Sequence, residues 1–96
     1  MEINKFCKQA HQAAIKKGFW RDGKPISECL LLIITEICEA VEADRNEDEQ
    51  NLHEELADVF IRLGDLVGAM NIDIETEIKK KMVFNELRSQ KHGKKY

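Results

Sequence analysis

The sequence predicts an all-α fold, and three observations support this class. Apolar residues recur at helical spacing along most of the chain, no segment alternates apolar and polar residues as a strand does, and there is one proline. With 96 residues, 43% hydrophobic and 34% charged, the chain should form one domain covering residues 1–96. We expect a four-helix bundle with helices over about residues 2–17, 28–44, 51–70 and 74–89.

The first helix carries an apolar stripe over residues 3–14, and Gly18 should end it. Residues 19–26 contain a glycine and the proline, so they are expected to form the longest loop. Ser27 would then cap the second helix with its hydroxyl group.

A short polar turn at residues 45–50 leads into the third helix, which predicts that the second and third helices pack antiparallel. Asn71 suits the end of the third helix, and Asp73 suits the N-cap of the fourth. A single copy of this size buries a modest share of its surface, so we expect a homo-oligomer, either a dimer or a tetramer, to complete the bundle.

Composition narrows the possible partners. The formal net charge of −3 gives no general attraction to a nucleic-acid polymer or a membrane surface. The longest apolar run, Cys29–Ile34, is too short to span a bilayer, and no signal peptide is apparent, so we expect a cytoplasmic protein.

Cys7, Cys29 and Cys38 form no CxxC pair and are interpreted as reduced core residues.

Two pairs of acids stand on adjacent expected helices, Glu36-x-x-Glu39 and Glu55-x-x-Asp58. The spacing places both acids of a pair on one helix face, and apolar neighbours surround Glu36. Antiparallel packing would bring the four carboxylates together, and oxygen ligands alone favour Mg²⁺, with Mn²⁺ as a substitute. The alternative is that they are exposed acids paired with basic residues, for example Asp58 with Arg62.

On the fourth helix the apolar stripe of Ile74 and Ile78 continues as Lys81, Asn85 and Arg88. These three side chains could line a cleft and hold phosphate or sugar oxygens. Equally, the helix could simply emerge into solvent, where basic residues favour its C-terminal end.

The two acidic pairs, taken together, are similar to the signature of the MazG-like all-α nucleotide pyrophosphohydrolases. The resemblance extends through Lys81 to Asn85 and the basic ending 92–96, as in small phage and bacterial members. It implies Mg²⁺-dependent hydrolysis of a nucleoside triphosphate, a dNTP above all, to the monophosphate and pyrophosphate, for nucleotide-pool control or house-cleaning. It also implies metal ligation by the four acids and a catalytic role within the pair Glu36 and Glu39.

The resemblance further implies a set of substrate contacts. The spacing of His11 and Trp20 is similar to the base pocket of the dCTP pyrophosphatase branch, although both could equally be structural residues. The other candidates for phosphate or sugar contacts are Lys81, Asn85, Arg88, Lys94, Lys95 and Tyr96.

Two positions depart from the family pattern. Thr35 stands where many relatives carry another Glu, and Arg62 stands where the dCTP pyrophosphatase branch tends to have an aromatic residue. The preference for a base is therefore not carried over. Two other functions remain open, a non-catalytic module of the same fold that binds a nucleotide or a protein, and a purely structural helical oligomer.

Overall fold

The computed structural model describes residues 1–88, and all regular structure within them is α-helical. The helices are α1 (Ile3–Lys16), α2 (Ile26–Arg45), α3 (Glu49–Ala69) and α4 (Ile74–Leu87). The predicted all-α fold is confirmed. No helix in these residues is both long enough and apolar enough to cross a membrane.

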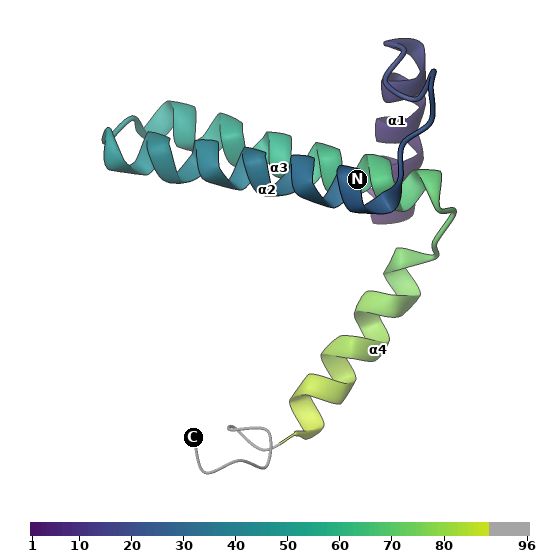
Figure 1. The fold of residues 1–96 in the computed structure, drawn as a ribbon. Helices are drawn as coiled ribbons and strands as arrows, with labels where there is room; N and C mark the ends of the chain where they lie inside the picture. Colours follow the sequence, from purple (N-terminus) through teal and green to yellow (C-terminus); the bar gives the residue numbers. More distant parts are fainter. Residues whose placement is uncertain (89–96) are drawn as a thin grey trace.

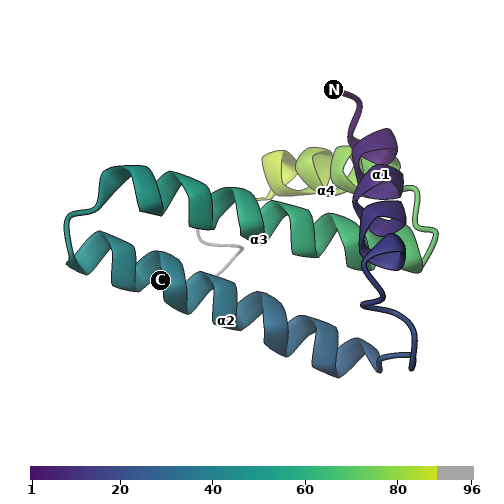
Figure 2. The same cartoon turned by 90° about the horizontal axis from the view of Figure 1, so that it is seen from above.

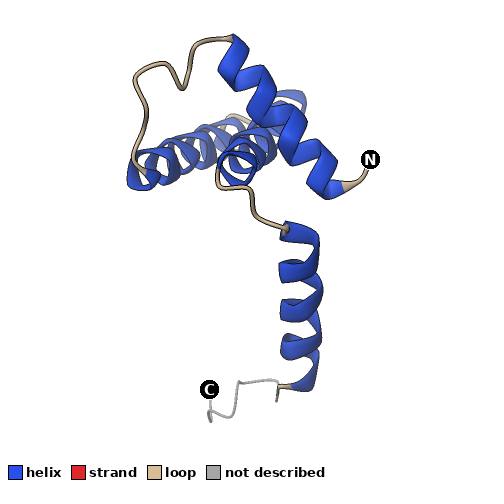
Figure 3. Ribbon diagram, turned by 90° about the vertical axis from the view of Figure 1, so that its right-hand side faces the viewer, coloured by secondary structure: helices blue, strands red, loops and turns tan. Residues whose placement is uncertain are grey.

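The helices α2 and α3 lie side by side and antiparallel, as predicted from the short turn between them (Figures 1 and 2). The helix α1 crosses one end of this pair and packs on α3. The fourth helix, α4, contacts α1 near its own N-terminal end and then points away from the other three (Figures 1 and 3). The structure therefore places α2 and α3 as the two walls on which the acidic pairs stand.

The predicted cap of the second helix is wrong. α2 begins at Ile26, and Pro25 occupies the N-cap position with no side-chain cap hydrogen bond. The Pro25 carbonyl accepts hydrogen bonds from the backbone N–H groups of Glu28 and Cys29 at 3.0 and 3.3 Å. Because proline needs no N–H partner and has a helix-compatible φ, the helix starts directly after it. Ser27 therefore lies inside the first turn and is not the cap.

Other helix ends follow the sequence signals more closely. Gly18 and Asn71 follow α1 and α3 with φ values of 81° and 54°, in the left-handed conformation that ends helices. The Asp73 side chain accepts a hydrogen bond from the Thr76 N–H at 3.2 Å, which confirms the predicted cap of α4. Asp48, which was not predicted as a cap, accepts from a backbone N–H in the same way and starts α3 at Glu49.

The core is thin and consists largely of small residues. Cys7, Ala10 and Ala14 of α1 are buried, and α3 meets α1 at Gly68, where a Cβ atom would lie 2.4 Å from the Cys7 carbonyl oxygen. A second buried cluster joins α2 and α3 and contains Cys29, Ile33 and Leu66. No side chain within residues 1–88 is less than 2% exposed, so the described part of the chain buries few large groups completely.

Much apolar surface is left on the outside. Cys38 is exposed, which corrects its predicted place in the core; it stands on the same face of α2 as the exposed Ile34 and Val41. Phe60 on α3 is 68% exposed, and α4 has no buried residue. A groove of about 620 Å³ between α1, α3 and α4 is lined by Met1, Ile3, Phe6, Cys7, Phe60, Leu63, Gly64, Val67, Ile74 and Ile78.

Candidate active site

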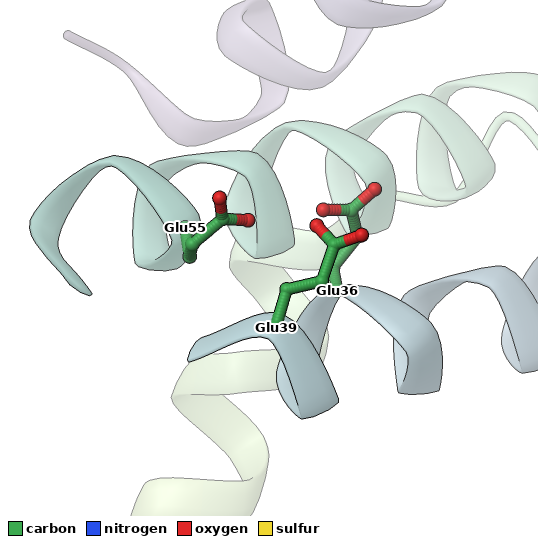
Figure 4. Close-up of side chains that lie close together, drawn as sticks. All are labelled: Glu36, Glu39 and Glu55. Carbon is green, nitrogen blue, oxygen red and sulfur yellow. The ribbon is translucent and has the colours of Figure 1, made fainter. Parts of the chain in front are cut away.

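Three of the four predicted acids come together between α2 and α3. Glu36 and Glu39 project from α2 and Glu55 from α3, and one carboxylate oxygen of each lies within 4.8 Å of the others (Figure 4). The i, i+3 spacing on α2 and the antiparallel packing of α3 account for this meeting. The Glu36 side chain is only 12% exposed, so its charge is partly removed from water.

Glu55 combines a buried carboxylate oxygen with a raised pKa. Its Oε2 atom is buried and has no hydrogen-bond partner among the described residues. Burial raises the pKa of Glu55, and so do the hydrogen bond that its protonated form makes with Glu39 and the negative charges of Glu39, Asp58 and Glu36. A buried carboxylate oxygen without a partner is costly, and a cation at this point would satisfy it.

The donor set fits a divalent metal that prefers oxygen ligands, such as Mg²⁺ or Mn²⁺. Asp58 stands one turn beyond Glu55 on α3, is exposed, and is not part of the cluster of three. It does line the same groove as Glu36 and adds to the negative charge around Glu55. The structure thus gathers three of the predicted ligands and puts the fourth at the edge of the site.

Arg62 pairs with Glu36 rather than with Asp58, the partner considered from the sequence. Its Nε–H group donates to Oε1 of Glu36 at 2.7 Å, which links α3 to α2 directly beside the acidic cluster. The sequence indicated Arg62 as a departure from a family pattern and as a possible partner of Asp58 on its own helix, but not as a site residue. Its i+4 spacing from Asp58 gave no indication that it would reach across to the other helix.

A groove of about 270 Å³ opens next to the acids. Its charged lining residues include Glu36 of α2 and Asp58, Arg62 and Asp65 of α3, and the rest of the lining consists of Ala10, Ala13, Ala14, Lys17, Phe19 and Ile61. The groove therefore combines apolar side chains, among them three alanines of α1, with two cations, Lys17 and Arg62, and several acids. Lys17 was not predicted as a site residue, because only its position at the end of α1 places it there.

His11 and Trp20, the predicted base-pocket pair, touch each other and share a partner. Their rings are 5.3 Å apart with an interplanar angle of 81°, an edge-to-face arrangement. The Trp20 Nε1–H group donates to Asp65 Oδ1 at 2.9 Å, and His11 Nδ1 lies 2.9 Å from the same oxygen. Sequence reasoning missed Asp65, although it follows Asp58 by seven residues and so shares its helix face.

The basic residues predicted on the fourth helix do not reach the acids within one chain. The Lys81 ammonium and the Arg88 guanidinium lie over the ring of Phe84, at 4.9 and 5.0 Å from its centroid. The helix α4, which carries these two residues and Asn85, points away from α2 and α3 (Figures 1 and 3). The other predicted contacts, Lys94, Lys95 and Tyr96, lie outside the described residues.

The model of one protein family, the MazG nucleotide pyrophosphohydrolase domain, matches residues 25–90, which is more than half of the chain. The chain belongs to the MazG family. No curated protein and no solved structure matches the chain. The segment that matches the MazG domain contains all four acids and Arg62, whereas His11 and Trp20 precede it.

MazG membership indicates that the chain is a hydrolase that acts on nucleotides. It agrees with the all-helical structure and with a carboxylate cluster able to hold a divalent cation. The roles of individual residues in metal and substrate binding stay predictions.

Proposed function

We propose that this MazG-family chain hydrolyses a nucleoside triphosphate, in particular a deoxynucleotide, to the monophosphate and pyrophosphate in a Mg²⁺-dependent reaction. The family match supports the reaction class. The observation that carries the metal dependence is the buried Oε2 of Glu55, which lies beside Glu36 and Glu39 and has no hydrogen-bond partner within residues 1–88. A cluster of like charges with an unsatisfied buried oxygen is stabilised by a cation and destabilised without one.

In this proposal Glu36, Glu39 and Glu55 hold the metal, and Asp58 completes the set from the groove wall. A bound Mg²⁺ or Mn²⁺ supplies charge neutralisation at the phosphates and a water of lowered pKa. Glu36 and Glu39 are the candidates for the residue that accepts the proton of the attacking water. Both stand on α2, a 20-residue helix whose rigidity fixes the two carboxylates one turn apart.

The groove beside the acids suits a nucleotide. The alanines and Ile61 that line it offer an apolar surface, and Phe19, which is 48% exposed, provides an aromatic edge for the base. Lys17, which also lines the groove, would provide a cation near the phosphates. His11 and Trp20 would shape the base end, held in place by Asp65.

We also propose that the chain works as a homo-oligomer. The exposed apolar side chains of α2 and α4, together with the 620 Å³ groove that Phe60 lines, form a surface that water solvates poorly. A second copy is the simplest cover for it. Such an assembly would also give Lys81, Asn85 and Arg88 a route to the acids of a neighbouring copy, since α4 points away from α2 and α3 of its own copy. A cytoplasmic location stays a prediction.

The reaction is tested by incubating the protein with each common NTP and dNTP plus Mg²⁺ and measuring pyrophosphate and orthophosphate separately. Pyrophosphate release that is lost on chelation and in Glu55→Gln would support the proposal. Glu54→Gln, a neighbour on the exposed side of α3, is the matched control and should retain activity. Nucleotide binding without any product would indicate the non-catalytic module, and orthophosphate alone would indicate cleavage of a different bond.

A further inference from the structure

The Arg62 guanidinium lies against one acid of the candidate metal site. Its Nε atom lies 2.7 Å from Oε1 of Glu36, one of the three clustered acids. The Glu36 side chain is 12% exposed and that of Arg62 is 38% exposed, so the pair is only partly screened by water. Arg62 therefore supplies a positive charge to the acidic cluster, and it does so from α3 to an acid of α2.

Arg62 has other acids within reach along its own helix. Asp58 stands four residues before it and Asp65 three residues after it on α3. Asp65 is occupied by His11 and Trp20, and within residues 1–88 the ion pair of Arg62 is the one with Glu36. The guanidinium thus reaches across to α2 and pairs with an acid of the three-carboxylate cluster.

A divalent cation at the acidic cluster would compete with this ion pair. Two positive charges a few ångströms apart repel each other, and the repulsion is strong where the carboxylates are partly buried. The same Glu36 carboxylate cannot serve both without that cost. Metal binding should therefore weaken the contact between Arg62 and Glu36.

A released Arg62 side chain would remain in the nucleotide groove. Arg62 lines the groove that also contains Lys17, Phe19 and Asp65, and it lines a smaller adjoining pocket beside Trp20. A triphosphate in this groove carries the oxygens that a guanidinium binds most readily, in forked pairs of hydrogen bonds.

We propose that Arg62 is an exchangeable counter-ion, paired with Glu36 in the metal-free protein and transferred to the phosphates of the nucleotide when a divalent cation binds. This inference rests on the proposed function, because it assumes that the cluster takes a metal and the groove a nucleotide. It assigns Arg62 as a substrate-binding residue. It also predicts effects of opposite sign on metal and nucleotide affinity when Arg62 is neutralised.

The first test compares the wild type with Arg62→Gln, Arg62→Lys and the control Arg45→Gln, whose arginine is exposed at the end of α2. Mn²⁺ dissociation constants are measured by electron paramagnetic resonance without nucleotide. Binding of a non-hydrolysable dNTP analogue is measured by calorimetry with saturating Mg²⁺. Circular dichroism confirms that each variant is folded.

Neutralising Arg62 should tighten Mn²⁺ binding by about threefold to tenfold, because a partly screened repulsion is removed. It should weaken binding of the analogue by about tenfold or more, because a charged contact to phosphate is lost. Arg62→Lys should leave the Mn²⁺ affinity near that of the wild type and weaken nucleotide binding less. Equal or weaker Mn²⁺ binding by a folded Arg62→Gln would overturn the exchange, as would unchanged nucleotide binding.

A second measurement needs no variant to fold. The Arg62 side-chain Nε–H resonance, observed in the wild type by NMR, should be protected from solvent exchange without metal. Protection should fall on adding Mg²⁺ and return when the nucleotide analogue is added. A resonance that does not respond to Mg²⁺, in a protein shown to bind Mn²⁺, contradicts the exchange but leaves the proposed function standing. A wild type that binds neither metal nor nucleotide overturns both.

Discussion

Replacing Asp65 by asparagine should loosen the attachment of α1 and the following loop to α3. In the wild type one carboxylate oxygen contacts both His11 Nδ1 and Trp20 Nε1, each at 2.9 Å. Asparagine keeps an accepting oxygen but removes the charge, and its amide N–H group faces the indole N–H that approached Oδ2 at 3.2 Å. Two charge-assisted contacts would become one or two weaker ones.

The size of the effect follows from these two contacts. A hydrogen bond to a charged group contributes about 1.5–3 kcal/mol and a neutral one about 0.5–1.5 kcal/mol, so each contact loses about 1 kcal/mol. The His11 and Asp65 side chains are 23% and 19% exposed, and water will partly replace what is lost. We therefore expect the free energy of unfolding to fall by about 1–2 kcal/mol, and Tm by about 5–10 °C in a domain of this size.

Trp20 makes this change directly observable, because it is the one tryptophan in the sequence. Urea unfolding is followed by its fluorescence and by circular dichroism at a fixed protein concentration. Asp22→Asn also removes one carboxylate charge, from an exposed position in the loop that contains Trp20, and is the matched control. If Asp65→Asn unfolds at the same urea concentration as the control and its Trp20 emission maximum is unchanged, Asp65 does not hold α1 and the loop against α3.

Three further predictions concern the metal, the helix packing and the assembly. Because the pKa of Glu55 is raised in the folded protein, its contribution to the stability of the metal-free protein is present at low pH and is lost as pH rises through that pKa. The Glu55→Gln variant should remove this pH dependence of stability in urea titrations. The Mg²⁺ affinity, measured by calorimetry, should change in the opposite sense and rise with pH. Gly68→Ala should lower Tm through a backbone clash costing about 1–3 kcal/mol, offset by about 1 kcal/mol of helix propensity. Gly64→Ala should cost less in the same melts, since only the Phe6 ring must move. Phe60→Ser should shift sedimentation equilibrium towards the monomer, and a monomeric wild type at the same concentration would contradict the proposed assembly.

Fold class and helix order were predictable because they depend on local signals. Helical periodicity, the cap at Asp73 and the left-handed position at Asn71 are properties of a few adjacent residues. The cap of α2 was mispredicted because Pro25 and Ser27 both carry helix-starting signals, and the helix begins directly after the proline, which comes first. The buried state of Cys38 was mispredicted because periodicity does not say which of two apolar faces of α2 meets α3.

The candidate site was predictable to the extent that it depends on helix faces. The meeting of Glu36, Glu39 and Glu55 follows from i, i+3 spacing and antiparallel packing. Asp65 and Arg62 were missed because their partners stand 54 and 26 residues away in sequence, and such contacts depend on where α1 and α2 cross α3. The sequence does not determine which acid a long basic side chain will pair with when several acids are within reach.

The carboxylate cluster and the exposed apolar surface affect stability in the same direction. Ionised acids held close together lower the free energy of unfolding, and the thin core offers little apolar burial to compensate. A bound divalent cation reduces the repulsion between the carboxylates, and association of copies buries the exposed apolar surface. Both the divalent cation and a second copy bind only the folded chain. The apparent stability therefore rises with the concentration of the cation and, separately, with that of the protein. A Tm that rises with protein concentration in the presence of a chelator, and rises again with Mg²⁺ at fixed protein concentration, would separate the two contributions in one set of melts.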